Sequence, residues 1–222
     1  MSRFVSKIIF IILIILSIIL LLLSTIGIET SKFNSLISQK INQSNENLIL
    51  EFSKIKFKLD IKEVSLYLET NNPRIIYRKE SIPVENIKVY ANFLSLIKSE
   101  PKIEKVYIGL NEIDAENLKK ISLKFKPSNL TSFIKNKVVQ GKLKAEIEIY
   151  FDNQNMIDNF ISRGSVTNLE AEILDNLNIS KGKFKFFADK SDVLIQNFFG
   201  RSDFFRISDG DVKVSLSSEI NL

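Results

Sequence analysis

Residues 8–28 decide the fold: they read IIFIILIILSIILLLLSTIGI and contain no charged side chain. A helix of about 21 residues at ~1.5 Å rise is roughly 31 Å long, which matches the ~30 Å hydrocarbon core of a bilayer. A buried core helix is the alternative, but it would need apolar partners on every side, and the rest of the chain does not supply them. The sequence therefore predicts a transmembrane helix over residues 8–28.

The flanks of this stretch predict its orientation. Arg3 and Lys7 precede it. A cleaved signal peptide has a shorter apolar core of ~7–15 residues and a small-residue cleavage site such as Ala-x-Ala, which is missing here. We expect an uncleaved anchor, with a cleaved signal peptide as the alternative. The positive-inside rule then keeps residues 1–7 in the cytoplasm and places everything after Glu29 in the periplasm of a bacterium, beyond its inner membrane.

The composition excludes several kinds of site. The 222 residues include no Cys, His or Trp. No disulfide, Cys nucleophile, Ser-His-Asp triad or usual zinc site can therefore form. The net charge of +5 comes from Lys residues spread singly along predicted strands, which predicts a solvated face, with attraction to anionic lipid headgroups as the alternative. The scarcity of Arg argues against a nucleic-acid site. We expect no enzyme activity, no cofactor and no nucleic-acid partner.

Two pairs of acidic residues in predicted turns are candidates for a calcium loop. These pairs are Asp189 with Asp192 and Asp209 with Asp211. Neither has the spacing or the number of ligands that such a loop requires. We therefore expect no metal site.

The apolar pattern changes from a helical period to a period of two after residue 46. Residues 30–44 have helical spacing and predict a short amphipathic helix within a linker over 29–46. From residue 47 onward, apolar residues alternate with Lys, Glu, Asp and Ser, which is typical of strands with one apolar face. Predicted strands cover residues 54–62, 64–69, 75–77, 84–89, 103–110, 142–151, 166–173, 182–188, 192–196 and 212–220.

Short helical inserts and turns separate these strands. One helix is predicted over residues 92–98. Another is predicted over residues 155–163, with Gly164 as its C-terminal cap. Asp114 should cap a helix through residue 121, Pro127-Ser128 should open a helix through Val138, and residues 123–125 between them should be extended. Hairpin turns are predicted at Lys190-Ser191 and at Asp209-Gly210.

These elements predict a mainly β protein. A single transmembrane helix is followed, over residues 47–222, by an antiparallel β-meander that forms an open groove with short helical inserts. A sheet with one apolar face must cover it, as a barrel, a sandwich or a trough that holds acyl chains. From the residues alone, a filled structural core is the simpler alternative to a groove. Because the strand pattern runs to Leu222, where an exposed strand would be a sticky edge, we expect the protein to continue beyond it.

One unit of the chain resembles a known family. Residues 82–108 (IPVENIKVYANFLSLIKSEPKIEKVYI) combine a strand, a Leu-rich helical turn and another strand, after Val64-Ser-Leu-Tyr-Leu-Glu and Asn72-Pro-Arg-Ile-Ile-Tyr. With the N-terminal apolar stretch, this layout resembles the N-terminal region of the AsmA-like family, which includes TamB and YhdP. The resemblance implies a periplasmic β-groove that carries phospholipid between the inner and outer membranes, and no catalytic motif. The long bridge of that family is absent from this chain.

The candidate site is a lipid-binding groove lined by the alternating apolar residues. Its expected partners are membrane phospholipid, the inner membrane and other envelope proteins. The alternative is an anchored β-sandwich scaffold that assists outer-membrane protein assembly through its edge strands. The residues that we expect to line the groove are Ile55, Phe57, Leu59, Val64, Leu66, Leu68, Leu143, Ile147, Ile149, Val212 and Val214.

Overall fold

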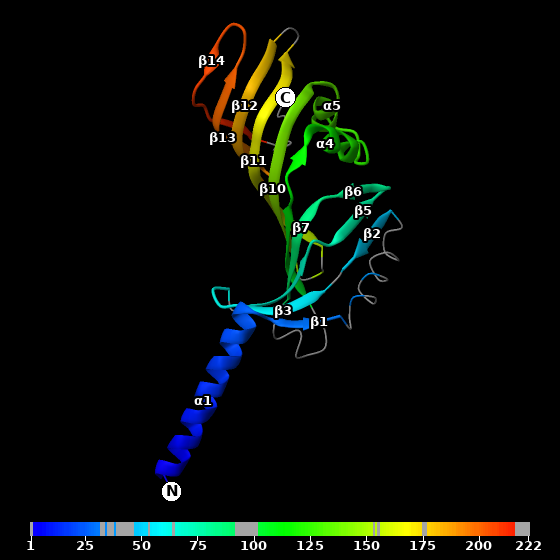
Figure 1. Ribbon diagram of the computed structural model, residues 1–222. Coiled ribbons are helices and arrows are strands. Elements are labelled where there is room, and N and C mark those ends of the chain that lie inside the picture. Colours follow the sequence, from blue (N-terminus) through cyan, green and yellow to red (C-terminus); the bar gives the residue numbers. More distant parts are fainter. Residues whose placement is uncertain are drawn as a thin grey trace.

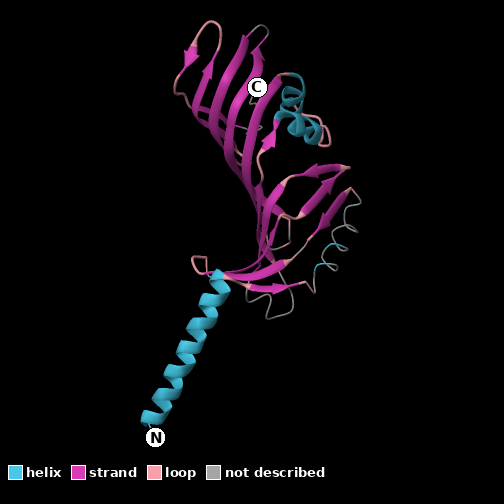
Figure 2. Cartoon of the chain, in the orientation of Figure 1, coloured by secondary structure: helices cyan, strands magenta, loops and turns pink. Residues whose placement is uncertain are grey.

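The computed structural model is mainly β, with one long N-terminal helix and two antiparallel sheets (Figures 1 and 2). The predicted fold class is therefore confirmed. Nearly all of the predicted helix over 30–44, and all of that over 92–98, lie outside the described residues. The structure describes residues 2–31, 34, 38, 47–52, 54–63, 65–91, 102–152, 154, 156–174 and 177–215.

The apolar stretch forms α1 (Ser2–Thr25). Its segment Phe4–Thr25 has a mean hydropathy of 3.3 and none of it is buried, so it is long and apolar enough to cross a membrane; a signal sequence has the same properties. The helix ends three residues before the predicted boundary, because Gly27 adopts a left-handed φ of 75°. The amides of Ile26 and Gly27 both donate to the Leu22 carbonyl, at 3.0 and 2.9 Å. The first strand follows at once.

The larger sheet is a meander of antiparallel neighbours. Its order in space follows the chain as β1-β3-β4-β7-β8-β10-β11-β12-β13-β14, while β9 pairs with β10 and β15 pairs with β13. The twelve strands are β1 (Ile28–Thr30), β3 (Ile55–Asp60), β4 (Ser65–Asn71), β7 (Val84–Ala91), β8 (Ile103–Leu110), β9 (Ile113–Asp114), β10 (Val138–Phe151), β11 (Ile157–Leu174), β12 (Leu177–Ala188), β13 (Asp192–Arg201), β14 (Arg206–Ile207) and β15 (Val212–Ser215).

A second sheet and two helices lie on one side of the larger sheet (Figure 1). The second sheet consists of β2 (Leu48–Glu51), β5 (Arg74–Tyr77) and β6 (Glu80–Ile82). Its Leu50 and Ile75 form a buried cluster with Val84 and Ile87 of β7. The helices are α4 (Ala115–Ser122) and α5 (Asn129–Asn136), and Ala115 and Phe133 pack against buried residues of β10 and β11.

Both helices begin where their capping residues predict. The Asp114 carboxylate accepts from the Asn117 amide at 2.8 Å, and Ser128 and Thr131 form a capping box. The prediction of extended backbone at 123–125 is wrong, because the Leu123 amide donates to the Lys119 carbonyl at 3.2 Å and a turn continues α4. The second helix is also shorter than predicted, since Val138 is the first residue of β10.

The predicted helix over residues 155–163 is wrong. Residues 157–163 belong to β11 and pair with β10, for example Phe160 with Ile149. The helical spacing of apolar residues there is overridden by pairing with a long neighbouring strand. Gly164 is correspondingly not a helix cap. It lies within β11, where an added Cβ would be 2.1 Å from the Lys144 carbonyl oxygen.

The hairpin predicted at Lys190-Ser191 is confirmed, since it joins β12 to β13. The hairpin predicted at Asp209-Gly210 is wrong. Both β14 and β15 pair with β13, so they are two parts of one returning strand. The chain reverses instead over residues 202–205, and the Gly210 carbonyl accepts from the Phe198 amide at 2.8 Å. The rest of the predicted final strand, residues 216–220, lies outside the described residues.

A row of β-bulges crosses strands β11, β12 and β13 of the larger sheet. The register shifts next to Asn168 in β11, Lys181 in β12 and Asn197 in β13. Each of these residues has a left-handed φ, of 51°, 53° and 53°. A bulge bends its strand and increases the local twist, so neighbouring bulges curve this part of the sheet.

Candidate functional site

One side of the larger sheet carries a continuous apolar surface from its first strand to its last. Residues paired directly across antiparallel strands lie on the same face. Pairing connects Ile28 to Phe57 and continues strand by strand to Ile149 with Phe160. From Gly164, on the same face of β11, it continues through Phe186 and Ile195 to Val212. We define the apolar face as Ile28, Ile55, Phe57, Leu59, Leu66, Leu68, Ile87, Val89, Val106, Ile108, Leu143, Ile147, Ile149, Phe160, Val166, Phe184, Phe186, Val193, Ile195, Val212 and Val214.

Ten of the eleven residues predicted from the sequence lie on this apolar face, and the eleventh, Val64, lies outside the described residues. They do not form one compact site, because they are spread from β3 to β15. Ile55 is buried at 4% exposure, whereas Val212 and Val214 are 50% and 47% exposed. The other seven are half-buried.

The sequence prediction missed the members of the apolar face on β1, β7, β8, β11, β12 and β13. Most of them show the same alternation as the predicted residues, for example Phe184 with Phe186 and Val193 with Ile195. That alternation was the available signal. Phe160 could not be found in this way, because its neighbours have helical spacing.

The apolar face is only partly covered. The smaller sheet packs over its β7–β8 region, where Val89 and Val106 join the buried cluster. Helices α4 and α5 cover the neighbourhood of Val166 and Phe184. Farther along, the face residues of β12 and β13 are half-buried and those of β15 are exposed. No large side chain among the described residues is more than 98% buried. Exposed apolar surface of this extent is characteristic of an interaction site.

The opposite side of the sheet carries a network of tyrosines and charged residues. We call it the polar face. Tyr67 stacks on Tyr90 with ring centroids 5.1 Å apart, and the Lys105 Nζ lies 4.3 Å from the centroid of Tyr90. Lys88 lies over both Tyr67 and Tyr107, at 5.6 and 5.4 Å. Such cation–π contacts order the long lysine side chains.

A buried carboxylate lies at the centre of this network. Glu69 is 8% exposed, and its oxygens lie 2.7 Å from Lys58 Nζ and 3.8 Å from Lys88 Nζ. The hydrogen bond from Lys58 to Glu69 raises the pKa of Lys58. The sequence predicted a solvated face here. Instead the long side chains cover one another, and the network contributes to the packing of the sheet.

The tyrosines of the polar face are held in their neutral form. Burial, followed by the charge of Glu146, raises the pKa of Tyr107 to about 12. The hydrogen bond to Glu148, followed by burial, raises the pKa of Tyr150 to about 12. Burial is also the main cause that raises the pKa of Tyr90. These phenols are therefore packing and hydrogen-bonding groups at neutral pH.

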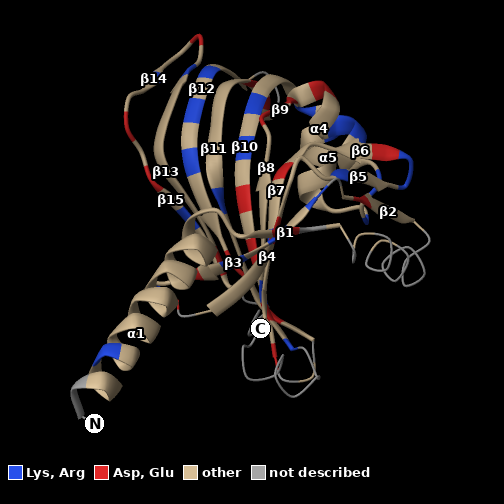
Figure 3. Ribbon diagram, turned by 60° about the horizontal axis from the view of Figure 1, so that its bottom comes forward, with Lys and Arg blue, Asp and Glu red and all other residues tan. Residues whose placement is uncertain are grey.

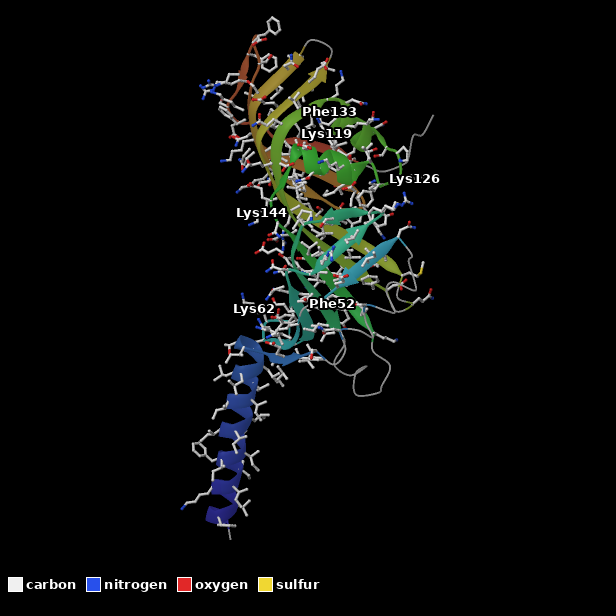
Figure 4. The ribbon with its side chains drawn as sticks, turned by 45° about the vertical axis from the view of Figure 1, so that its right-hand side comes forward. Phe52, Lys62, Lys119, Lys126, Phe133 and Lys144 are labelled. Carbon is white, nitrogen blue, oxygen red and sulfur yellow. The ribbon has the colours of Figure 1, made fainter. Side chains whose placement is uncertain are left out.

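Charge is distributed unevenly along the polar face. Strand β10 carries both acidic and basic residues, whereas β12 carries only basic ones (Figure 3). Lys144 points away from Phe133 and the covering helices (Figure 4). Arg163 of β11 bridges Glu146 and Glu148 of β10, at 3.1 and 2.9 Å. Ion pairs of this kind align neighbouring strands and contribute little each when they are exposed.

The acidic residues considered for calcium serve in turns. Asp189 accepts from the amides of Ser191 and Asp192, at 2.7 and 2.9 Å. Asp211 accepts from the Asn197 amide at 2.9 Å, beside a surface pocket that Asp209 and Gly210 also line. Within the described part of the chain, no group of three or more acidic side chains is placed to hold a metal ion.

The arrangement offers a long apolar surface, and such a surface can act by burying apolar area of a partner. In comparisons with known proteins, no family model, curated protein or solved structure matches the chain.

Proposed function

We propose that this chain is a membrane-anchored protein that binds phospholipid acyl chains on its apolar face. In this proposal α1 is an uncleaved anchor in a bacterial inner membrane, with its N-terminus in the cytoplasm and the sheets in the periplasm. The protein would take part in lipid transport to the outer membrane or in envelope biogenesis. The observation that supports this most is an apolar face that begins three residues after α1 and stays only partly covered to β15.

The physical basis is burial of apolar surface. An acyl chain on the apolar face removes area from water on both sides, at roughly 25 cal/mol per Å². Ile28 is 61% exposed and pairs with Phe57, so the face begins where α1 ends. Because every member of the face is uncharged, an acyl chain would meet no strong trap along it. The resemblance to the AsmA-like family implies the same activity.

A pair of neighbouring phenylalanines provides a direct test. Phe186 lies on the apolar face and pairs with Gly164, whereas Phe187 lies on the polar face and pairs with Arg163. Benzoylphenylalanine at position 186 should cross-link phospholipid in membranes, and the same residue at position 187 should not. Mass spectrometry of the adducts identifies the lipid. Equal cross-linking at both positions, or none at either, would contradict the proposal.

A second matched pair tests affinity. Ile195 and Leu194 are consecutive half-buried residues of β13 that lie on opposite faces. Ile195→Asp should reduce the phospholipid that co-purifies in mild detergent several-fold, because it places a charge in the apolar face. Leu194→Asp should leave the amount unchanged. Urea unfolding of both variants separates lost binding from lost folding.

The alternative is an anchored scaffold that assists outer-membrane protein assembly by strand addition. Within residues 177–215, the outer edge of β13 is paired only by the short strands β14 and β15, and all four residues of β15 are exposed. This alternative predicts protein adducts from a photoreactive residue at position 214 and no lipid adduct at position 186.

A further inference from the structure

The junction between α1 and the larger sheet is short and tightly packed. Only Ile26 and Gly27 separate the helix from β1. A Cβ added to Gly27 would lie 2.7 Å from both the Lys58 side chain and the Phe57 carbonyl oxygen. The end of α1 is thus in contact with β3, so the first strands of the sheet cannot move far from the end of the helix.

The turn between β3 and β4 lies beside the same end of α1 (Figure 1), and Lys62 of this turn is close to the helix end (Figure 4). The turn is well supported. The Asp60 carboxylate accepts from the amides of Lys62 and Glu63, at 2.9 and 3.2 Å. Both carboxylate oxygens of Glu63 lie 2.9 Å from Lys105 Nζ on the polar face. The position of the turn relative to the sheet is therefore fixed.

The side chains exposed at this level are those that a bilayer interface accommodates. Ile26, Ile28 and Ile61 are 64%, 61% and 59% exposed. Lys62 is also exposed, and a lysine can place its aliphatic part against apolar surface while its ammonium reaches phosphate groups. Three exposed isoleucines beside a helix long enough to cross a membrane are unfavourable in water and favourable at an interface.

We propose that Ile26, Ile28, Ile61 and Lys62 form a membrane-contact surface that holds the first strands against a bilayer containing anionic phospholipid. The inference rests on the anchoring role proposed for α1, and not on lipid binding by the apolar face. With this surface in contact, β1 and β3 lie at the headgroup level. The apolar face then begins at the bilayer, without a water-filled gap that an acyl chain would have to cross.

The absence of cysteine from the chain allows a clean depth measurement. The full chain with Ile61→Cys, labelled with an environment-sensitive fluorophore, is reconstituted into vesicles of phosphatidylcholine with phosphatidylglycerol. Spin-labelled phospholipid should quench this label several-fold more strongly than a label at Leu174→Cys. Leu174 is similarly exposed, at 64% against 59% for Ile61, and ends β11 at the end of the sheet farthest from α1 (Figure 1). Equal quenching at the two positions would overturn the proposal.

Charge reversal tests the anionic partner. Added to Ile61→Cys, Lys62→Glu should lower the quenching in vesicles with phosphatidylglycerol and change it little in phosphatidylcholine alone. Lys126→Glu, in the exposed connection between α4 and α5, is the matched control and should have no effect (Figure 4). If Lys62→Glu acted no more strongly than Lys126→Glu, the anionic preference would be overturned.

The result is independent of the proposed lipid binding by the apolar face. A quenched label at position 61 without lipid adducts at position 186 would retain the membrane-contact surface and reject acyl-chain binding. Adducts at position 186 with an unquenched label at 61 would do the opposite.

Discussion

At the scale of single residues, glycine and tyrosine determine how closely the strands approach. Gly164 pairs with Phe186 of β12, and the aromatic ring lies over the space that a side chain would occupy. On the other side of the sheet, the tyrosines of the polar face pack as neutral phenols, Tyr67 stacks on Tyr90, and Tyr150 donates to Glu148. A glycine thus makes room for the ring of its cross-strand partner on one face, and tyrosines fill space on the other.

Gly164→Ala should destabilise the fold by about 1–3 kcal/mol, because the added Cβ would overpack the strand. Its position would be 2.1 Å from the Lys144 carbonyl oxygen, which belongs to the backbone of β10 and cannot rotate away. Gly210→Ala is the control, since the nearest atom there, from Ile207, is 3.6 Å away. Urea unfolding in detergent measures both, and equal stability of the two variants would contradict the packing argument.

Stability should fall in the alkaline range. A phenol whose folded pKa is raised contributes stability in full below its unfolded pKa of about 10, and loses it as pH rises toward the folded pKa. The pKa of Tyr107 and that of Tyr150 are each raised to about 12. The free energy of unfolding should therefore decrease between about pH 10 and pH 12. The raised pKa of Lys58 acts in the same direction above its ordinary value of 10.5.

Replacing both phenols by Phe tests the cause of that decrease. In the Tyr107→Phe, Tyr150→Phe double variant the decrease should be shallower, because two of the titrating groups are gone. The measurement is urea unfolding at a series of alkaline pH values. An unchanged pH profile would show that other groups determine alkaline stability.

At the scale of elements, pairing between long strands overrides the secondary structure that local spacing predicts. A segment with helical spacing is part of strand β11, because β11 lies between β10 and β12 and pairs with both. The bulges of β11, β12 and β13 lie in neighbouring strands, and each uses a non-glycine residue in left-handed backbone. This conformation costs an L-residue roughly 1–2 kcal/mol, which the surrounding sheet offsets.

Lys181→Gly should consequently stabilise the fold, by up to about 1 kcal/mol, because glycine adopts the φ of 53° without strain. Lys181→Val should destabilise it, since a β-branched residue is strongly disfavoured there. Lys185→Gly, where regular pairing with β13 resumes, should destabilise by roughly 0.5–1 kcal/mol, as glycine does within an ordinary strand. Opposite signs of the change in the free energy of unfolding at positions 181 and 185 would support the bulge, and equal signs would contradict it.

At the scale of the whole molecule, the coverage of the apolar face decreases along the sheet. The smaller sheet buries Val84 and Ile87 of β7, and the two helices bury Leu169 and Ala171 of β11. Past β12 the described structure provides no comparable buried cluster, and Val212 and Val214 are about half exposed. The uncovered end of the face lies on the edge strands, far from α1 along the order of strands.

Hydrogen exchange should follow this gradient. Amides of β7, β8 and β10 should exchange slowest, because their strands are paired on both edges and covered on one face. Those of β14 and β15 should exchange fastest, since these strands are short and exposed. Mass spectrometry of peptides from the full chain in detergent resolves the two regions. Uniform protection across the larger sheet would mean that the uncovered end is as stable as the covered one.

The sequence by itself determined the apolar helix and which side of most strands is apolar. Both depend on local periodicity: an unbroken apolar stretch, and alternation in residues such as Phe57, Leu59, Ile147 and Ile149. It also located the caps at Asp114 and Ser128, because a cap is made within one helical turn.

Only the tertiary structure decided that residues 157–163 form a strand and that Asp209-Gly210 interrupts a strand and does not reverse the chain. The same holds for the buried network of Glu69 and for the coverage of the apolar face by pieces distant in sequence. Each of these depends on pairing between segments far apart in the chain, and such pairing leaves no local signal when the helical and extended patterns fit the same residues equally well.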